Sequence, residues 1–587
     1  TYKWRSDRQL FVNGVSIKLK GVNRHDTHSQ LGHVTPMESL LRDVQLMKQM
    51  NVNCVRTSHY PNDPRWLDLC DEYGLYVVDE TDLECHGAQM GRWMTGDERM
   101  VFDFSGSPEW KKAYVDRAER MVCRDRNHPS IIMWSLGNES FYGENHAAMY
   151  ARIRELDPSR PIHYEGDREN HQSSDVVSVM YPAVEVVIRE GESDDPRPYF
   201  MCEYAHAMGN SNGGITDYTE YAYEEPLYQG GFIWEYMDHG IAVTSPDGKP
   251  GFAYGGDFGD RPTDREFCVD GLVLPDRRNT PKMDAVKAAY APLKITLTDT
   301  EAVIENRNLF TDLNAYDLVF ASSVNGKPER RAVLRADCKP GGTEHIPFPF
   351  ALPEAGLACM TVTAIQRAAL PGIPAGYEAA LGQVWHNYAV ARLTLPAPQL
   401  VEMDCNVGVK GEGFEYIFGR GKGLVSIRYN GVQLLDDTVR PNFWRAPTNN
   451  DEGCAEPFTF AFWKTAGLYA RCDNLTAETK GDFVIARANY TLPDGQTLPI
   501  DFAIDGAGRC DITMTWQGTR TELPEFGLLF PLRRELTEVS YLGLGPRETT
   551  ADRTAGGKMG AWNYNVRQDF AQNTPVYPQE CGSRTGV

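Results

Sequence analysis

Residues 1–295 alternate short apolar runs with segments of helical periodicity, and this alternation constrains the fold most strongly. Eight of the runs have the length and composition of buried strands. They are SIKLKGVNRH (16–25), VNCVRTSHY (52–60), LYVVDETDLECHG (75–87), SIIMWSLGNE (130–139), PIHYEGD (161–167), DVVSVMYP (175–182), PYFMCEYAH (198–206) and GGFIWEYMD (230–238). Because strands that alternate with helices build parallel sheets, eight of them predict a (β/α)8 barrel of the TIM type over residues 1–295.

The segment 35–50 predicts one of the barrel helices. Thr35 suits the N-cap, Pro36 suits the first turn, and Glu38 completes a capping box. A second helix is predicted over 107–127, where Ser107 and Pro108 open a segment of helical periodicity. The connection RENHQSSD (168–175) has no helical period. We therefore expect the barrel to be irregular at its fifth crossover.

The pattern changes to strands alone after about residue 295. Period-two stretches such as YDLVFASSV (316–324), separated by Gly/Pro turns, predict an immunoglobulin-like β-sandwich over 296–396. LPAPQL (395–400) is typical of a linker, and a larger β-sandwich is predicted over 401–587, with a hairpin at 424–435. Both ends of the chain fall inside strand-rich sequence, so we expect a longer protein with its last sandwich cut short.

Composition excludes several classes of function. The net charge of −22 argues against partners that are nucleic acids or anionic membranes. No apolar run approaches the roughly 18 residues that a membrane span requires. The 13 cysteines are scattered, odd in number and without a C-x-x-C pair, which is typical of reduced thiols in a cytoplasmic protein.

Polar and aromatic side chains follow the apolar runs at their carboxyl ends. In (β/α)8 barrels these ends form the rim that carries the active site. The residues concerned are Asn23, Arg24, His25, Arg56, Ser58, His59, Glu84, His86, Asn138, Glu139, Tyr181, Glu203, His206, Trp234, Glu235, Tyr236 and Asp238.

Glu139 and Glu203 stand out because they end the fourth and seventh strands, whose ends face each other across a barrel. Facing carboxyl groups about 5–5.5 Å apart catalyse glycoside hydrolysis with retention, one as nucleophile and one as acid. A glutamate that ends a single strand is usually a solvated surface residue, and Arg56 is equally consistent with a structural ion pair at the rim. The convergence of all these residues on one rim favours the catalytic interpretation.

Longer motifs resemble one known family. The segments NVNCVRTSHYPNDPRWLDLCDEYGLYVVDE (51–80) and DRNHPSIIMWSLGNES (125–140) are similar to the two signature segments of glycoside hydrolase family 2. CEYAHAMGNS, YGGDFGD, NFWRAPTNNDEG and YLGLGPRETTADR resemble its large bacterial β-galactosidases, and the resemblance covers essentially the whole chain.

The resemblance implies roles for individual residues. Glu139 would be the acid/base, Glu203 the nucleophile, and Tyr181 the hydrogen-bond donor to the nucleophile. His25 and His59 would stabilise the transition state, and Arg56 would support the rim. The implied sugar contacts are Asn138, His206, Tyr236 and Asp270.

Two cations are also implied by the resemblance. Glu84, His86 and Glu139 match magnesium ligands, and the carbonyl of Phe267 with Asp270 matches a sodium site. Asp270 stands where the family usually has asparagine. The familiar rim tryptophan falls at Tyr236, with Trp234 two residues earlier. We expect the two β-domains that precede the barrel in the family, one of which supplies a sodium ligand, to be absent, so the sodium site is incomplete.

The sequence thus predicts a retaining exo-β-galactosidase that hydrolyses terminal β-D-galactosides such as lactose through a covalent galactosyl-enzyme, with possible transfer to acceptors. The full protein is expected to be a homo-oligomer. One alternative is another retaining β-glycosidase of the same family. A second is an inactive carbohydrate-binding barrel, which predicts loss of Glu139 or Glu203, and both are present.

Overall fold

The computed structural model describes residues 2–4, 9–88, 102–167, 172–191, 195–389, 393–520 and 522–587. The chain forms two compact units. The first comprises Thr1–Tyr388, Tyr541–Trp562 and Asn573–Val587, and the second comprises Ala389–Ser540 and Asn563–Gln572. In the described part of the chain, no helix combines the length and apolarity needed to cross a membrane.

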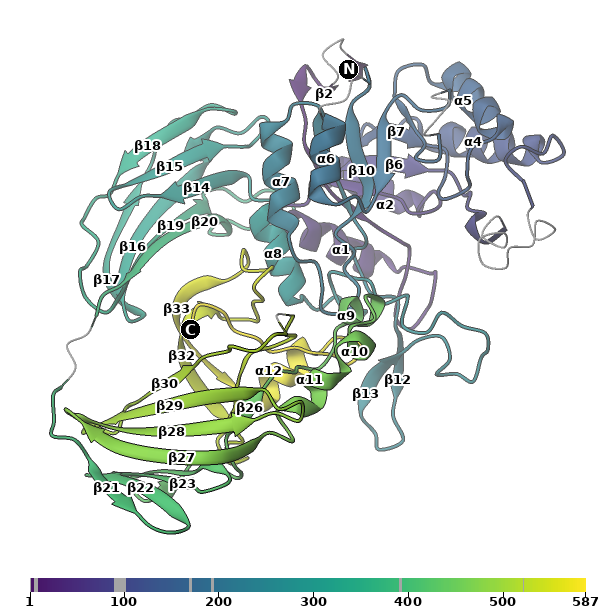
Figure 1. The fold of residues 1–587 in the computed structure, drawn as a ribbon. Coiled ribbons are helices and arrows are strands. Elements are labelled where there is room, and N and C mark those ends of the chain that lie inside the picture. Colours follow the sequence, from purple (N-terminus) through teal and green to yellow (C-terminus); the bar gives the residue numbers. More distant parts are fainter. Residues whose placement is uncertain are drawn as a thin grey trace. The chain divides into compact units, whose positions relative to one another are not determined.

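The first unit contains the predicted barrel. Its strands form one eight-stranded sheet in the order β8-β7-β6-β5-β4-β11-β10-β9, and all neighbouring pairs are parallel (Figure 1). The strands are β4 (Leu19–Asn23), β5 (Cys54–Arg56), β6 (Tyr76–Glu80), β7 (Ile131–Ser135), β8 (Ile162–His163), β9 (Val177–Met180), β10 (Tyr199–Tyr204) and β11 (Tyr228–Ile233). Seven of the eight predicted runs contain one of these strands and the eighth overlaps β11, so the predicted barrel is confirmed.

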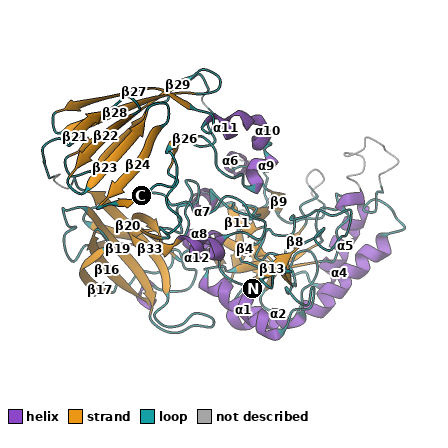
Figure 2. Ribbon diagram, turned by 90° about the horizontal axis from the view of Figure 1, so that it is seen from below, coloured by secondary structure: helices purple, strands orange, loops and turns teal. Residues whose placement is uncertain are grey.

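Helices follow most of the barrel strands and lie outside them (Figure 2). They are α1 (Met37–Gln49), α2 (Pro64–Tyr73), α4 (Lys111–Asp125), α5 (Glu144–Leu156), α6 (Val184–Gly191), α7 (Ile215–Glu224) and α8 (Pro281–Ala289). Between β8 and β9 no described residue is helical, as expected from RENHQSSD, of which 168–171 lie outside the described residues.

The predicted capping box of the first helix is wrong. Helix α1 begins at Met37, and Pro36 occupies the N-cap position in an extended conformation without a side-chain cap. The Thr35 hydroxyl is buried and has no hydrogen-bond partner among the described residues. Because the helix starts two residues after Thr35, its hydroxyl does not reach the first free N–H groups.

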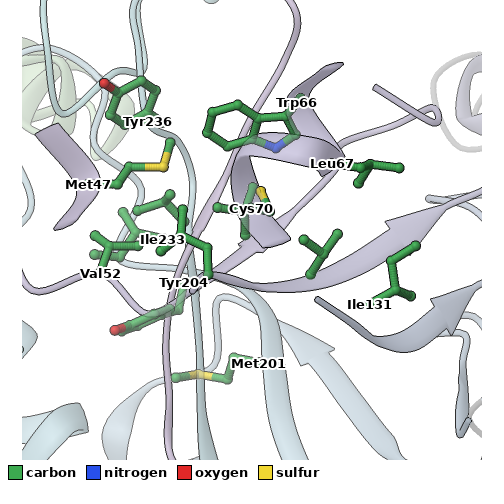
Figure 3. Close-up of a cluster of buried hydrophobic side chains, with 14 of the residues drawn as sticks. Met47, Val52, Trp66, Leu67, Cys70, Ile131, Met201, Tyr204, Ile233 and Tyr236 are labelled. Atoms are coloured by element: carbon green, nitrogen blue, oxygen red, sulfur yellow. The ribbon is translucent and has the colours of Figure 1, made fainter. Parts of the chain in front are cut away.

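The barrel core packs the inner faces of the helices against the strands. Figure 3 shows part of this cluster, in which Met47 of α1, Trp66 of α2 and Ile233 of β11 lie together. Tyr236 belongs to the same cluster and is 1% exposed. This packing fixes the strands, and so determines where their carboxyl ends present side chains.

Two short elements flank the barrel strands. A small antiparallel sheet, β1 (Tyr2–Trp4), β2 (Leu10–Val12) and β3 (Val15–Ser16), precedes β4. A hairpin of β12 (Ile241–Thr244) and β13 (Pro250–Ala253) lies between β11 and α8.

A seven-stranded β-sandwich follows α8. A three-stranded sheet, β14-β15-β18, and a four-stranded sheet, β17-β16-β19-β20, share one apolar core that includes Ile304, Phe320 and Val362. The strands are β14 (Leu293–Leu297), β15 (Glu301–Asn306), β16 (Tyr316–Val324), β17 (Lys327–Leu334), β18 (Thr343–Pro347), β19 (Leu357–Gln366) and β20 (Glu378–Asn387). Burial alternates along β16, as the period-two sequence predicts.

The second unit is also rich in β-strands. One sheet has the order β21-β22-β23-β24-β25 and another β27-β28-β29-β30, and Phe418 and Phe502 join their faces in one core. The predicted hairpin at 424–435 is present as β24 and β25. These strands are β21 (Gln399–Glu402), β22 (Asn406–Gly411), β23 (Phe414–Gly419), β24 (Gly423–Tyr429), β25 (Val432–Gln433), β27 (Arg471–Lys480), β28 (Phe483–Thr491), β29 (Thr497–Asp505) and β30 (Cys510–Met514).

The remaining elements after residue 439 are short. They are β26 (Arg440–Asn442), α9 (Asn449–Gly453), α10 (Glu456–Thr459), α11 (Ala461–Ala466), β31 (Gly527–Leu529), β32 (Glu538–Gly545), β33 (Lys558–Asn565) and α12 (Val566–Asn573).

Candidate active site

Glu203 lies at the carboxyl end of β10 and is 5% exposed. Its Oε1 accepts a hydrogen bond from Nη1 of Arg56 at 2.9 Å, and its Oε2 accepts one from the Tyr181 hydroxyl at 2.5 Å. Both carboxylate oxygens are therefore held, one by a guanidinium and one by a phenol. Tyr181 follows β9, so two neighbouring strands supply this pair.

Arg56 ends β5 and is fully buried. Besides Glu203, its guanidinium donates to Oδ1 of Asn23 at 3.0 Å, Oδ1 of Asn138 at 2.8 Å and Oε2 of Glu80 at 2.7 Å. Asn23 ends β4, Asn138 follows β7, and Glu80 ends β6. One arginine thus joins the ends of four strands to the Glu203 carboxylate.

Glu139 reaches the rim through a turn after β7. Gly137 has φ 139°, and a Cβ there would lie 2.7 Å from the Leu83 carbonyl oxygen, so only glycine fits. Glu139 itself has φ 35°, in the left-handed region that non-glycine residues seldom adopt. Its backbone N–H donates to Oε1 of Glu165 at 2.7 Å. The turn therefore directs the Glu139 side chain away from the core that buries Ile131–Ser135.

The environment of Glu139 differs from that of Glu203. Burial raises the pKa of Glu139, and the carboxylates of Glu203 and Glu84 raise it further, while His86 opposes them. The side chain is 33% exposed, so solvent and substrate reach it. A carboxyl group with a raised pKa is suited to donate a proton near neutral pH.

Glu84, His86 and Glu139 form a cluster with the chemistry of a cation site. One ligand atom from each lies within 4.8 Å of the others, and Nδ1 of His86 is 2.8 Å from Oε2 of Glu139. Asn138 borders the cluster and donates to Oε1 of Glu84 at 3.4 Å. Two carboxylates suit a hard cation such as magnesium, which completes its shell with water, and the residues present fit such an ion.

His59 and His25 lie together beside Glu203. Nδ1 of His59 is 2.8 Å from Oε1 of Glu80, and Nε2 is 3.8 Å from Oε1 of Glu203. The His25 ring meets the His59 ring edge-on at 5.5 Å, and its Nδ1 is 3.2 Å from the Tyr60 hydroxyl. Burial and the neighbouring histidines hold the pKa of His25 well below its usual value, so His25 is neutral.

Trp234 supplies the aromatic surface of the rim. Its ring stacks on His59 with centroids 5.0 Å apart, and its Nε1 donates to Oδ2 of Asp270 at 3.1 Å. The structure corrects the expectation for Tyr236, whose ring is buried and whose hydroxyl donates to Oδ1 of Asp43 at 3.3 Å. The resemblance placed the rim tryptophan of the family at Tyr236, but β11 ends at Ile233 and the residue that follows it, Trp234, supplies the ring at the rim.

His206, Phe267 and Asp270 lie together near Tyr181. Nε2 of His206 is 3.7 Å from Oδ2 of Asp270. The centroid of the His206 ring lies 5.6 Å from that of the Tyr181 ring and 5.9 Å from that of the Phe267 ring. Burial and the carboxylate of Glu235 raise the pKa of Asp270 to about 8. Its Oδ1 is buried without a hydrogen-bond partner among the described residues, which fits an oxygen that faces a cation.

Two residues that the sequence analysis did not assign are prominent here. Glu80 pairs with both Arg56 and His59, and Glu165 orients Glu139. Glu80 is the last residue of a buried run, YVVDE, and a glutamate in that position was the available signal. The sequence analysis instead places Glu84 and His86, further along the same segment, at the end of this strand, whereas β6 ends at Glu80.

Comparisons with known proteins agree with this arrangement. A family model described as "Glycosyl hydrolases family 2, TIM barrel domain" matches residues 5–295. Models described as "Beta-galactosidase, domain 4" and "Beta galactosidase small chain" match residues 302–387 and 410–587.

Curated relatives match nearly the whole chain. It is 37% identical to a beta-galactosidase of Halalkalibacterium halodurans, over 98% of this chain and 58% of that protein. It is 37% identical to one of Streptococcus thermophilus (99% and 59%) and 39% identical to one of Lactobacillus delbrueckii subsp. bulgaricus (99% and 58%). The chain therefore spans just under three fifths of the length of these relatives. Matched along almost its whole length by models and relatives of one family, the chain belongs to glycosyl hydrolases family 2.

Proposed function

We propose that the protein is a retaining exo-β-galactosidase. The observation that carries the proposal is the difference between its two rim carboxyl groups. Glu203 is charge-paired with Arg56 and hydrogen-bonded to Tyr181, whereas burial and neighbouring carboxylates raise the pKa of Glu139. Two carboxyl groups whose environments differ in this way are suited to opposite roles in glycoside hydrolysis.

In this mechanism Glu203 attacks the anomeric carbon while protonated Glu139 gives its proton to the leaving oxygen. The products of this step are the free aglycone and a glycosyl ester on Glu203. Glu139, now a carboxylate, takes a proton from water, and the water oxygen displaces Glu203 from the sugar. The hydrogen bond from Tyr181 to Oε2 of Glu203 stabilises the carboxylate as it leaves.

The sugar would be bound by the histidines and the tryptophan around Glu203. His25 is neutral and its Nδ1 is within hydrogen-bond distance of the Tyr60 hydroxyl, so we assign its Nε2 to a sugar hydroxyl. Burial lowers the pKa of His206 to about 4, so its imidazole is also neutral. The Trp234 face suits the apolar side of a pyranose ring, and we assign His59 and Asn138 to further hydroxyls.

Two cations belong to the proposal. Glu84, His86 and Glu139 would hold magnesium, which when bound favours the carboxylate form of Glu139. The carbonyl of Phe267 and Asp270 would contribute to a sodium site beside His206. The buried, unpartnered Oδ1 of Asp270 and the clustered ligand atoms of Glu84, His86 and Glu139 support these assignments.

Galactose specificity is proposed from the relatives, three of which are named beta-galactosidases. The substrates would be terminal β-D-galactosides such as lactose. A hollow lined by His86, Phe141 and Tyr142 beside Glu139 would receive the leaving group or an acceptor sugar, which would allow transfer as well as hydrolysis. Another β-glycosidase specificity within the family is the alternative.

A panel of nitrophenyl glycosides tests the specificity. The β-galactoside should be cleaved fastest by the full chain, and a faster β-glucoside or β-glucuronide would support the alternative. A 2-fluoro-galactosyl fluoride tests the mechanism because it traps the covalent intermediate on the nucleophile. We expect the label on Glu203 and none on the Glu203→Gln variant. A label on a different residue would contradict the assignment.

A further inference from the structure

We propose that Glu80 is a positioning residue that holds Arg56 and His59 in the geometry that the nucleophile requires. The inference rests on the proposed function, because it gives Glu80 a role in the same reaction. It concerns a side chain to which the sequence analysis assigned no role.

Glu80 is the last residue of β6 and is fully buried. Its Oε2 accepts from Nε of Arg56 at 2.7 Å and from Oγ of Ser135 at 2.7 Å, and its Oε1 lies 2.8 Å from Nδ1 of His59. Its backbone N–H donates to Oγ1 of Thr57 at 2.9 Å. Both carboxylate oxygens and the backbone amide of Glu80 are thus fixed by residues of β5, β7 and the segment after β5.

The contact with Arg56 determines where the guanidinium points. Because the guanidinium is planar, a bond from Nε to Glu80 fixes the directions of the two terminal nitrogens. Nη1 then reaches Oε1 of Glu203 at 2.9 Å, and Nη2 reaches Oδ1 of Asn138 at 2.8 Å. Without Glu80 the guanidinium can rotate, and both contacts lose their direction.

The contact with His59 determines its tautomer. Burial acts to raise the pKa of Glu80, but Arg56 and His59 outweigh it and lower the pKa to about 2. Glu80 is therefore a carboxylate that only accepts hydrogen bonds, and Nδ1 of His59 must carry the proton. This leaves Nε2 directed toward Glu203, at 3.8 Å from its Oε1, where the sugar would bind.

Glu80 also shares the positive charge of Arg56. In the structure the guanidinium is paired with two carboxylates, Glu80 through Nε and Glu203 through Nη1. Removal of the Glu80 charge would leave Glu203 as the only anionic partner of this buried cation among the described residues. Loss of Glu80 would therefore change both the direction of the guanidinium and the balance of charge around the nucleophile.

Steady-state kinetics of Glu80→Gln and Glu80→Asp in the full chain test the proposal. Glu80→Gln keeps the shape but loses the charge, and one of its oxygens becomes an NH2 that faces a donor. We expect kcat to fall by about 100-fold, the usual effect of misplaced catalytic groups, with a smaller change in KM. Glu80→Asp keeps the charge and should restore part of kcat.

A double-mutant cycle separates positioning from a general structural role. If Glu80 acts partly through His59, the substitution Glu80→Gln should cost less activity in a His59→Ala background than in the wild type. The matched control is Asp157→Asn, since Asp157 is also buried and paired with an arginine, Arg160, at 2.6 Å. Asp157 follows α5, away from the rim, so this variant should melt earlier and keep its kcat.

The outcomes are distinguishable. No turnover and no fluorosugar label in the wild type would overturn the proposed function, and with it any role for Glu80. Wild-type turnover together with an unchanged kcat in Glu80→Gln, or equal costs in both His59 backgrounds, would overturn the role of Glu80 alone. If neither Glu80 variant folds, Glu80 is required for the fold and the proposal is also overturned.

Discussion

Trp234 lies flat against His59, with ring centroids 5.0 Å apart and ring planes 7° from parallel. The indole is fixed at its other end by the hydrogen bond from Nε1 to Asp270. One face of the Trp234 ring thus packs against His59, whose Nε2 lies 3.8 Å from Oε1 of Glu203. The Trp234 ring is half-buried. An aromatic ring held in this way next to the nucleophile is suited to pack against a sugar.

Replacement of Trp234 by alanine should weaken the binding of a galactose analogue. We expect a loss of roughly 1–3 kcal/mol, as for a well-packed aromatic anchor. Isothermal titration with a non-hydrolysable galactoside measures the loss.

Tyr236→Phe is the matched control for this prediction. It removes the hydroxyl that donates to Asp43 in the core, which should lower the free energy of unfolding by about 1 kcal/mol. Affinity for the analogue should not change. The assignment of the two aromatic residues would be reversed if Tyr236→Phe weakened binding while Trp234→Ala did not.

The eight strands of the barrel could be predicted because each is a short apolar run followed by polar residues. This signal is local, and it predicts Glu139, Glu203 and Tyr181 at the carboxyl ends of their strands, where the structure joins Tyr181 to Glu203. The prediction for Tyr236 is wrong because Tyr236 lies beyond the end of strand β11. Alternation orders side chains only within a strand, and β11 ends at Ile233.

The partners of Arg56 could not be predicted in the same way. Glu203 lies 147 residues further along the chain and Asn138 lies 82 residues further, and no periodicity links them. Which of several rim acids pairs with the arginine depends on the closed barrel and on side-chain rotamers. The partners of Glu80 are unpredictable for the same reason, although its position at the end of a buried run was visible.

Glu139→Gln should separate the two steps of the reaction. A substrate with a good leaving group needs little protonation, so its first step should survive better than that of lactose. Sodium azide should then restore turnover and yield a β-galactosyl azide, because an anion needs no general base. Nuclear magnetic resonance of the product checks both its identity and its configuration. Equal losses on all substrates without rescue would contradict the acid/base role.

Removal of the cation should shift the alkaline limb of the pH–activity profile. Glu139 acts as an acid only while protonated, so activity falls as pH rises through its pKa. A cation at Glu84 and His86 favours the carboxylate, so chelation should raise the apparent pKa and move the alkaline limb to higher pH. The profile of kcat with and without EDTA measures the shift.

Glu84→Gln is the control for chelation, because it removes one ligand and one negative charge while Glu139 stays. Its profile should respond little to EDTA. A wild-type profile that is the same in both buffers would show that no catalytic cation binds at this cluster.

A buried carboxyl pair beneath the rim predicts a dependence of stability on pH. Asp79 of β6 and Asp125 of α4 are both fully buried, and Oδ2 of each has no hydrogen-bond partner among the described residues. Because the two carboxyl groups interact, we expect them to share a proton. Thr57 donates to Asp79 at 3.1 Å, and Arg124 donates to Asp125 at 2.6 Å. Burial and the Asp125 carboxylate raise the pKa of Asp79 well above its usual value of 3.8.

The sign of the pH effect follows from this shift. A carboxyl whose pKa is higher in the folded than in the unfolded state contributes stability that is full below pH 3.8 and is lost as pH rises through the folded value. Asp79→Asn removes the ionisable group, and its amide can still donate to Asp125. The melting temperature of this variant should therefore match or fall below that of the wild type at pH 4 and exceed it at pH 8.

Asp157→Asn should show the opposite sign in the same thermal unfolding series. Burial opposes its ionisation, but hydrogen bonds from Ser159 and Arg160 lower the pKa of Asp157 to about 2. Its contribution is present above pH 3.8 and fades as pH falls toward 2, so the variant should be less stable than the wild type at pH 8 and closer to it at low pH. Because the two aspartates differ in the direction of the shift and not in chemistry, opposite trends would identify the shared proton as the cause. If Asp79→Asn lowered the melting temperature as much at pH 8 as at pH 4, the pair would not share a proton, and Arg124 and Thr57 would instead be stabilising two carboxylates.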